Sequence, residues 1–105
     1  MDNGTRLENA RIVDIGLYYL GHYRRLSVRA ELAVRSGGCM VTIPQSKLPK
    51  LMDMFDDELG GKIEDGVFIN ELKGKPVRVL FDGNDRAIGL GDILCSEDEV
   101  IMLKD

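Results

Sequence analysis

His22, the histidine of this sequence, and the tyrosines around it are the residues best suited to carry chemistry. It precedes Tyr23 directly and follows Tyr18 and Tyr19 closely. An imidazole with a pKa of about 6.5 suits general acid and base work, but it needs a carboxylate or thiol partner. We predict no catalytic residue. A small hydrolase that uses His22 with nearby carboxylates is kept as an alternative function.

Arginines alternate along the segment after His22 and define the candidate ligand-binding site. Arg25, Arg29 and Arg35 share one face of a predicted strand over residues 24–35. Guanidinium groups bind phosphates, and aromatic rings stack on bases. The predicted ligand-binding residues are Tyr18, His22, Arg24, Arg25, Arg29 and Arg35. The ligand would be a small anion, such as a signalling nucleotide, or an acidic protein. The alternative is that these arginines only keep the strand soluble.

The residue spacing predicts no metal site and no cofactor. Neither Cys39 nor Cys95 has a second cysteine or a histidine two to four residues away, as a zinc site requires. The carboxylates of residues 53–58 lack the glycine-centred loop of a calcium site. The Gly89-Leu90-Gly91 run lacks a third glycine and does not join a strand to a helix, so it is a poor phosphate loop.

The two halves of the chain carry opposite charge, although the net charge is −4. Residues 6–35 hold six arginines against three carboxylates, and residues 53–105 hold 14 carboxylates against six cations. The basic half favours a phosphate-binding face, whereas the acidic total argues against binding of duplex nucleic acid. The alternative is that the two halves neutralise each other in the fold.

The length of 105 residues fits a single domain over residues 1–105. The two cysteines lie in apolar surroundings, as buried thiols of a reducing compartment do. The sequence has no recognisable secretion signal and no apolar run near the roughly 18 residues that a membrane helix needs. We therefore expect a cytoplasmic protein without a membrane partner.

Hydrophobic periodicity predicts an α+β fold, with a mostly antiparallel sheet of five to six strands and one amphipathic helix packed on one face. Strict alternation over residues 24–35 predicts a long strand. Val13, Ile15, Leu17 and Tyr19 are predicted to share one face of the preceding strand, over residues 10–20. The remaining predicted elements are a strand ending at Pro44, a helix capped by Ser46 and stopped by Gly60-Gly61, an undecided segment over 63–72, a hairpin over 77–94 that turns at Asp82–Asp85, and a strand over 100–103.

The C-terminal half, with the run Glu71–Val79, a DG turn and the run Ala87–Leu94, resembles the end of small uncharacterised domains encoded by bacteriophages and prophages. Those domains also open with a strand like Asn9–Asp14 and carry a glycine pair like Gly37-Gly38. The resemblance implies a small phage accessory protein, a class that includes inhibitors of host defence, in the cytoplasm of the host cell.

The expected function is therefore non-enzymatic binding, which either sequesters an anionic ligand or blocks a host protein. A further alternative is an assembly module, in which an exposed edge strand pairs with a second copy to give a homo-oligomer.

Overall fold

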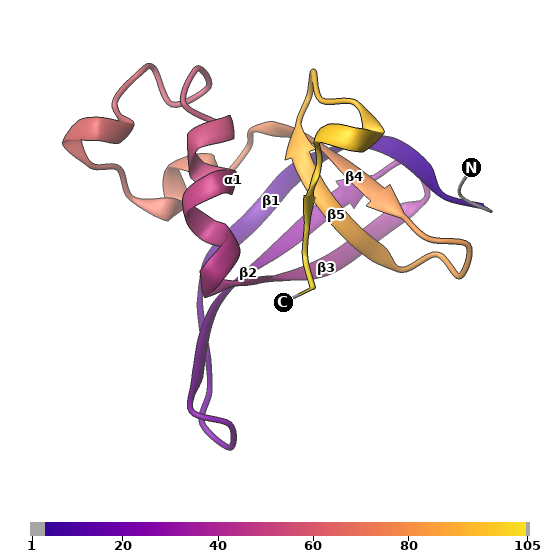
Figure 1. Cartoon of the computed structure of the whole chain (residues 1–105), viewed down its shortest axis with the longest axis horizontal. Helices are drawn as coiled ribbons and strands as arrows, with labels where there is room; N and C mark the ends of the chain where they lie inside the picture. The colour runs from indigo at the N-terminus through magenta and orange to yellow at the C-terminus, as the bar shows by residue number, and fades with distance from the viewer. Residues whose placement is uncertain (1–3, 105) are drawn as a thin grey trace.

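A six-stranded antiparallel sheet dominates the computed structural model, which describes residues 4–104 (Figure 1). The strand order is β3-β2-β1-β4-β5-β6. The strands are β1 (Arg6–Leu20), β2 (Arg25–Val34), β3 (Gly37–Pro44), β4 (Pro76–Phe81), β5 (Ala87–Asp92) and β6 (Ile101–Met102). The α-helix of this part of the chain is α1 (Leu48–Met54), and four 3-10 turns are η1 (Gln45–Lys47), η2 (Ile63–Asp65), η3 (Ile69–Leu72) and η4 (Glu97–Glu99). The predicted α+β class is confirmed.

The sheet curls on itself around the main core. Its two edge strands, β3 and β6, line one apolar groove of about 430 Å³, which includes Met40 and Met102. Side chains from β1 to β5 meet inside the curl, and Leu51 and Phe55 pack against them from the helical side. None of the helices between residues 4 and 104 has the length and apolar character to span a membrane.

A β-bulge in β1 corrects the predicted faces of this strand. Ile12 pairs with Leu32, whereas Asp14 pairs with the next residue along β2, Glu31, so Val13 is the extra residue. Ile12 and Ile15 are both buried, and Val13 is 43% exposed. The spacing had predicted that Val13 shares the core face with Ile15, and this prediction is wrong.

The helix is shorter than its apolar spacing predicts. Ser46 lies within η1 and does not cap α1, whose N-cap is Lys47. The helix ends at Met54 because Phe55 leaves the helical region, at φ −93° and ψ 11°. Turns carry the chain from there to residue 61, yet Leu59 is still buried. The undecided segment over 63–72 contains the two 3-10 turns η2 and η3.

Local hydrogen bonds hold the turn between β4 and β5 at the predicted position. The Asp82 Oδ1 atom accepts the N–H groups of Asn84 and Arg86, at 2.8 and 2.9 Å. Asp85 takes the left-handed conformation, with φ 62°. The Asp82 carboxylate thus serves the turn, as Asp does in many reversals of the chain.

Glycines in β5 allow the segment after it to fold back against the sheet. Leu80, Cys95 and Val100 form a small second core on the outer face of β4 and β5. A Cβ at Gly89 would lie 2.8 Å from the Val100 Cγ2 atom, and one at Gly91 would overlap the Cys95 Sγ atom. The Gly89-Leu90-Gly91 run is therefore explained by close packing.

Gly91→Ala should destabilise the fold by about 1–3 kcal/mol, because the added methyl group overpacks the Cys95 contact. Gly16→Ala is the matched strand control, since a Cβ at Gly16 would meet no atom within 4 Å. Urea unfolding of both variants measures the difference. Equal stability of the two variants would contradict the packing of residues 92–100 described above.

Asp82→Asn should make the free energy of unfolding fall less steeply as the pH is lowered into the acid range. Hydrogen bonds from the N–H groups of Arg86 and Asn84 lower the pKa of Asp82 in the folded protein. The ionised carboxylate therefore stabilises the fold fully above its unfolded pKa of about 3.9. This stabilisation is lost as the pH falls through the lower pKa of the folded protein. Urea unfolding across the acid range should show a steeper loss for the wild type than for the variant. Parallel curves would contradict this role.

Candidate functional site

The hairpin of β1 and β2 extends past the rest of the sheet as a two-stranded arm (Figure 1). We define the arm as residues 16–29. On one side, β4 pairs with β1 only up to Arg11, and on the other, β3 ends where Pro44 pairs with Ser27. The outer residues of the arm therefore have only each other as strand partners. The turn at its tip closes with Arg24 at φ 50°.

The core-facing side of the sheet continues onto the arm, where no core covers it. Ile15 and Val28 are buried at the base, at 7% and 1% exposure. Further out on the same face, Leu17, Tyr19 and Leu26 are 70%, 61% and 40% exposed. These three residues form what we call the apolar strip. Tyr23 adds an exposed ring at the tip.

The predicted ligand-binding residues lie in three separate places. His22, Arg24 and Arg25 are exposed at the tip of the arm, and Tyr18 and Arg29 lie near its base. Arg35 lies in the turn that follows the opposite end of β2. Ten residues of extended strand separate Arg25 from Arg35, which is about 33 Å at about 3.3 Å per residue. No single small molecule contacts all six residues.

Tyr18 and Arg29 are two of the predicted residues that do come together. The Arg29 guanidinium lies over the Tyr18 ring, 3.8 Å from its centroid. Gly16 stands opposite Arg29, and a Cβ at Gly16 would meet no atom within 4 Å. The shallow hollow here holds about 210 Å³, but Asp14 and Glu31 also line it. Two carboxylates beside one guanidinium oppose the binding of an anion.

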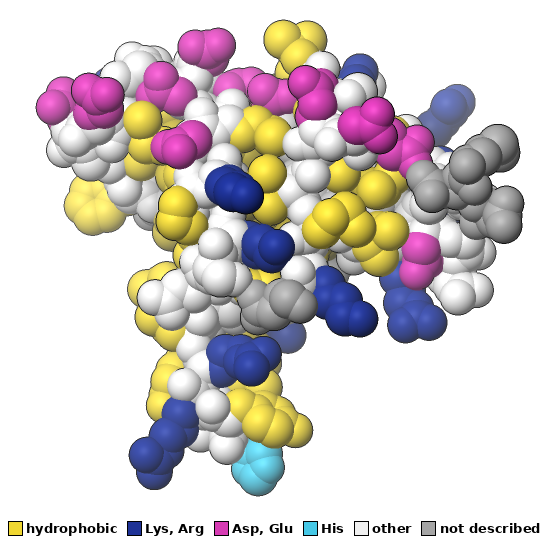
Figure 2. Space-filling view, in the orientation of Figure 1, with side chains coloured by type: hydrophobic (Ala, Val, Ile, Leu, Met, Phe, Trp, Pro, Cys, Tyr) yellow, Lys and Arg dark blue, Asp and Glu magenta, His cyan; other side chains and the backbone are white. Residues whose placement is uncertain are grey.

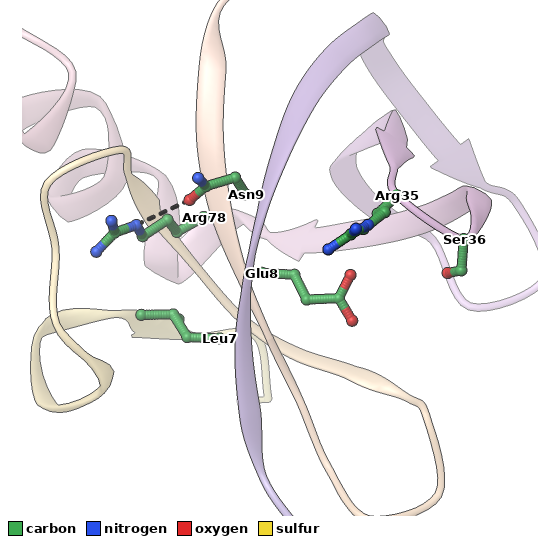
Figure 3. Close-up of a pocket in the computed structure, with 6 residues that line it drawn as sticks. All are labelled: Leu7, Glu8, Asn9, Arg35, Ser36 and Arg78. Carbon is green, nitrogen blue, oxygen red and sulfur yellow. Dashed lines mark hydrogen bonds between the residues drawn. The ribbon is translucent and has the colours of Figure 1, made fainter.

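Arg35 lines a different hollow, of about 770 Å³, at the far end of the sheet (Figure 3). The Glu8 carboxylate lies on the same side of it as the Arg35 side chain (Figure 3). Arg78 lines the opposite side and is held by the Asn9 Oδ1 atom and the Cys95 carbonyl, at 3.0 and 2.8 Å. Charges of both signs therefore line this hollow, and the guanidinium of Arg78 already has protein partners.

The catalytic alternative finds little support in the placement of its residues. The His22 ring contacts the Tyr23 ring, at 4.9 Å between centroids, and the sequence of the arm contains no carboxylate. Burial raises the pKa of the Cys39 and Cys95 thiols, which disfavours the reactive thiolate. Between residues 4 and 104, no three metal-ligating side chains lie close enough to hold an ion.

The structure adds a surface that sequence analysis did not identify as one unit. The segments over 53–65 and 92–99 meet where Met54, Asp92, Leu94 and Glu99 line a hollow of about 250 Å³. The first segment holds six carboxylates against Lys62, and the second holds four against no cation. We call these two segments the acidic end. These two acidic runs are distant in sequence and come together only in the fold.

Serine substitutions along the face that holds the apolar strip should differ in their effect on the free energy of unfolding, with a small effect on the arm and a large one in the core. Leu17→Ser and Tyr19→Ser should each change the free energy of unfolding by under about 1 kcal/mol, because both side chains are mostly exposed. Ile15→Ser, two residues toward the body on the same face, should cost at least about 2 kcal/mol. Urea unfolding provides the comparison. A cost for Leu17→Ser as large as that for Ile15→Ser would mean that the arm is packed.

The chain shows no significant match to a protein-family model, a curated protein or a solved structure.

Proposed function

We propose that this chain is a non-enzymatic binding protein that engages another protein through its arm. The observation that carries the proposal is the continuation of the core-facing side of the sheet into the exposed apolar strip of Leu17, Tyr19 and Leu26. Apolar surface that is rimmed by polar groups is typical of protein interaction sites. Arg24 and Arg25 supply such a rim at the tip.

A protein fits the arm better than a small ligand does. A small-molecule site is concave and surrounds its ligand, whereas the arm projects from the sheet (Figure 1). Tyrosine and arginine are also enriched among the residues that dominate protein interfaces. Within the expected phage accessory role, the proposal therefore favours blocking of a protein over sequestration of a nucleotide.

A photo-crosslinking amino acid at position 19 tests the proposal in the cells that naturally host the gene. With Tyr19→p-benzoylphenylalanine, irradiation should give a discrete protein adduct, because this side chain would lie at the centre of the contact. Adding Leu17→Ser to the same chain should reduce the adduct at least about tenfold, the loss expected for a central interface residue. The adducts are measured by blotting and identified by mass spectrometry.

The control carries the same amino acid in place of Arg86, whose side chain is 76% exposed on the other hairpin. Equal crosslinking from positions 19 and 86 would overturn the proposal. So would tight, stoichiometric binding of a cyclic nucleotide in calorimetry that is lost in Arg29→Ala. That result would move the working surface from the apolar strip to the hollow beside Tyr18.

A further inference from the structure

We propose that the partner of the arm is the acidic end of a second copy of this chain, an inference that rests on the proposed function. The arm would place its apolar strip against the apolar part of the acidic end. Its arginines would meet the carboxylates around that part. The chain would then be a self-assembling module.

The acidic end offers apolar surface beside two carboxylates. Leu94 is 84% exposed and lines the hollow together with Met54. Asp92 and Glu99 line the same hollow.

The arm is the chemical complement of this surface. It presents exposed apolar side chains together with Arg24 and Arg25, and its sequence holds no carboxylate. Opposite charges across an interface speed association and select the partner, whereas like charges disfavour the wrong one. Two arms packed on each other would bring arginines together. The charges therefore favour arm-to-end contacts over arm-to-arm contacts.

The two surfaces lie at opposite ends of the molecule. Figure 2 shows Asp and Glu side chains gathered along one end, where a few Lys and Arg side chains also lie, and further Lys and Arg side chains toward the other end and on the arm. An arm of one copy can thus reach the acidic end of the next, which leaves a free arm and a free acidic end on the pair. Contacts of this kind close into a ring or continue as a filament, and an antiparallel pair would satisfy both contacts at once.

Charge reversal with cross-complementation tests this inference on the purified full chain by sedimentation velocity. One variant combines Arg24→Glu with Arg25→Glu, and the other combines Asp57→Lys with Asp98→Lys, two exposed carboxylates of the acidic end. Each variant alone should need at least about tenfold higher concentration than the wild type to associate. An equimolar mixture should associate again, because the reversed arm of one fits the reversed end of the other.

Two further measurements complete the test. The double variant Lys73→Glu with Arg86→Glu lowers the net charge as much as the arm variant does, but outside the arm, and should associate like the wild type. Added salt should weaken association of the unmodified chain, since exposed charges are screened. A wild type that stays monomeric up to near-millimolar concentration at low salt would overturn the inference, as would a mixture that fails to associate. If Tyr19 nevertheless crosslinks another protein in cells, the proposed function stands and only self-assembly falls.

Discussion

The length of β1 is the constraint on which the rest of the molecule depends. This strand runs for 15 residues, whereas β4 pairs only with its first part. On the other side, β3 ends at Pro44, which pairs with Ser27, the β2 partner of Tyr18. Side chains of a strand alternate with a fixed period, so the face that buries Ile15 continues outward whether or not a core lies beneath it. The exposed Leu17 and Tyr19 follow directly from this mismatch between strand and core.

The bulge at Val13 determines which face the arm presents. Ala10 and Ile12 occupy even positions, whereas Ile15 and Leu17 occupy odd ones, and a regular strand would send these two pairs to opposite sides of the sheet. One extra residue brings both pairs to the core side. Because of the bulge, the apolar strip of the arm lies on the same side of the sheet as the core residues of its body.

Local rules predicted the parts of this fold that depend on near neighbours along the chain. Alternation gave β2, and the side-chain chemistry of Asp82 to Asp85 gave the second hairpin. The bulge was missed because Val13 continues the alternation of Ile15 and Leu17, and the early end of α1 was missed because Phe55 and Leu59 keep helical spacing. Of the candidate site, Tyr18 and Arg29 lie together on paired strands, although the sequence did not single out this pair. The projection of the arm and the joining of the acidic end depend on where distant neighbours stop, which spacing does not encode.

The two edge strands of the sheet, β3 and β6, affect how readily the chain aggregates through its backbone. Unpaired strand edges invite further strands to add, which leads to open-ended aggregation. Here β3 and β6 face one common groove, and β6 is only two residues long. A foreign strand approaching one edge is hindered by the other wall of the groove. The groove and the short β6 thus hinder backbone pairing at these two edges.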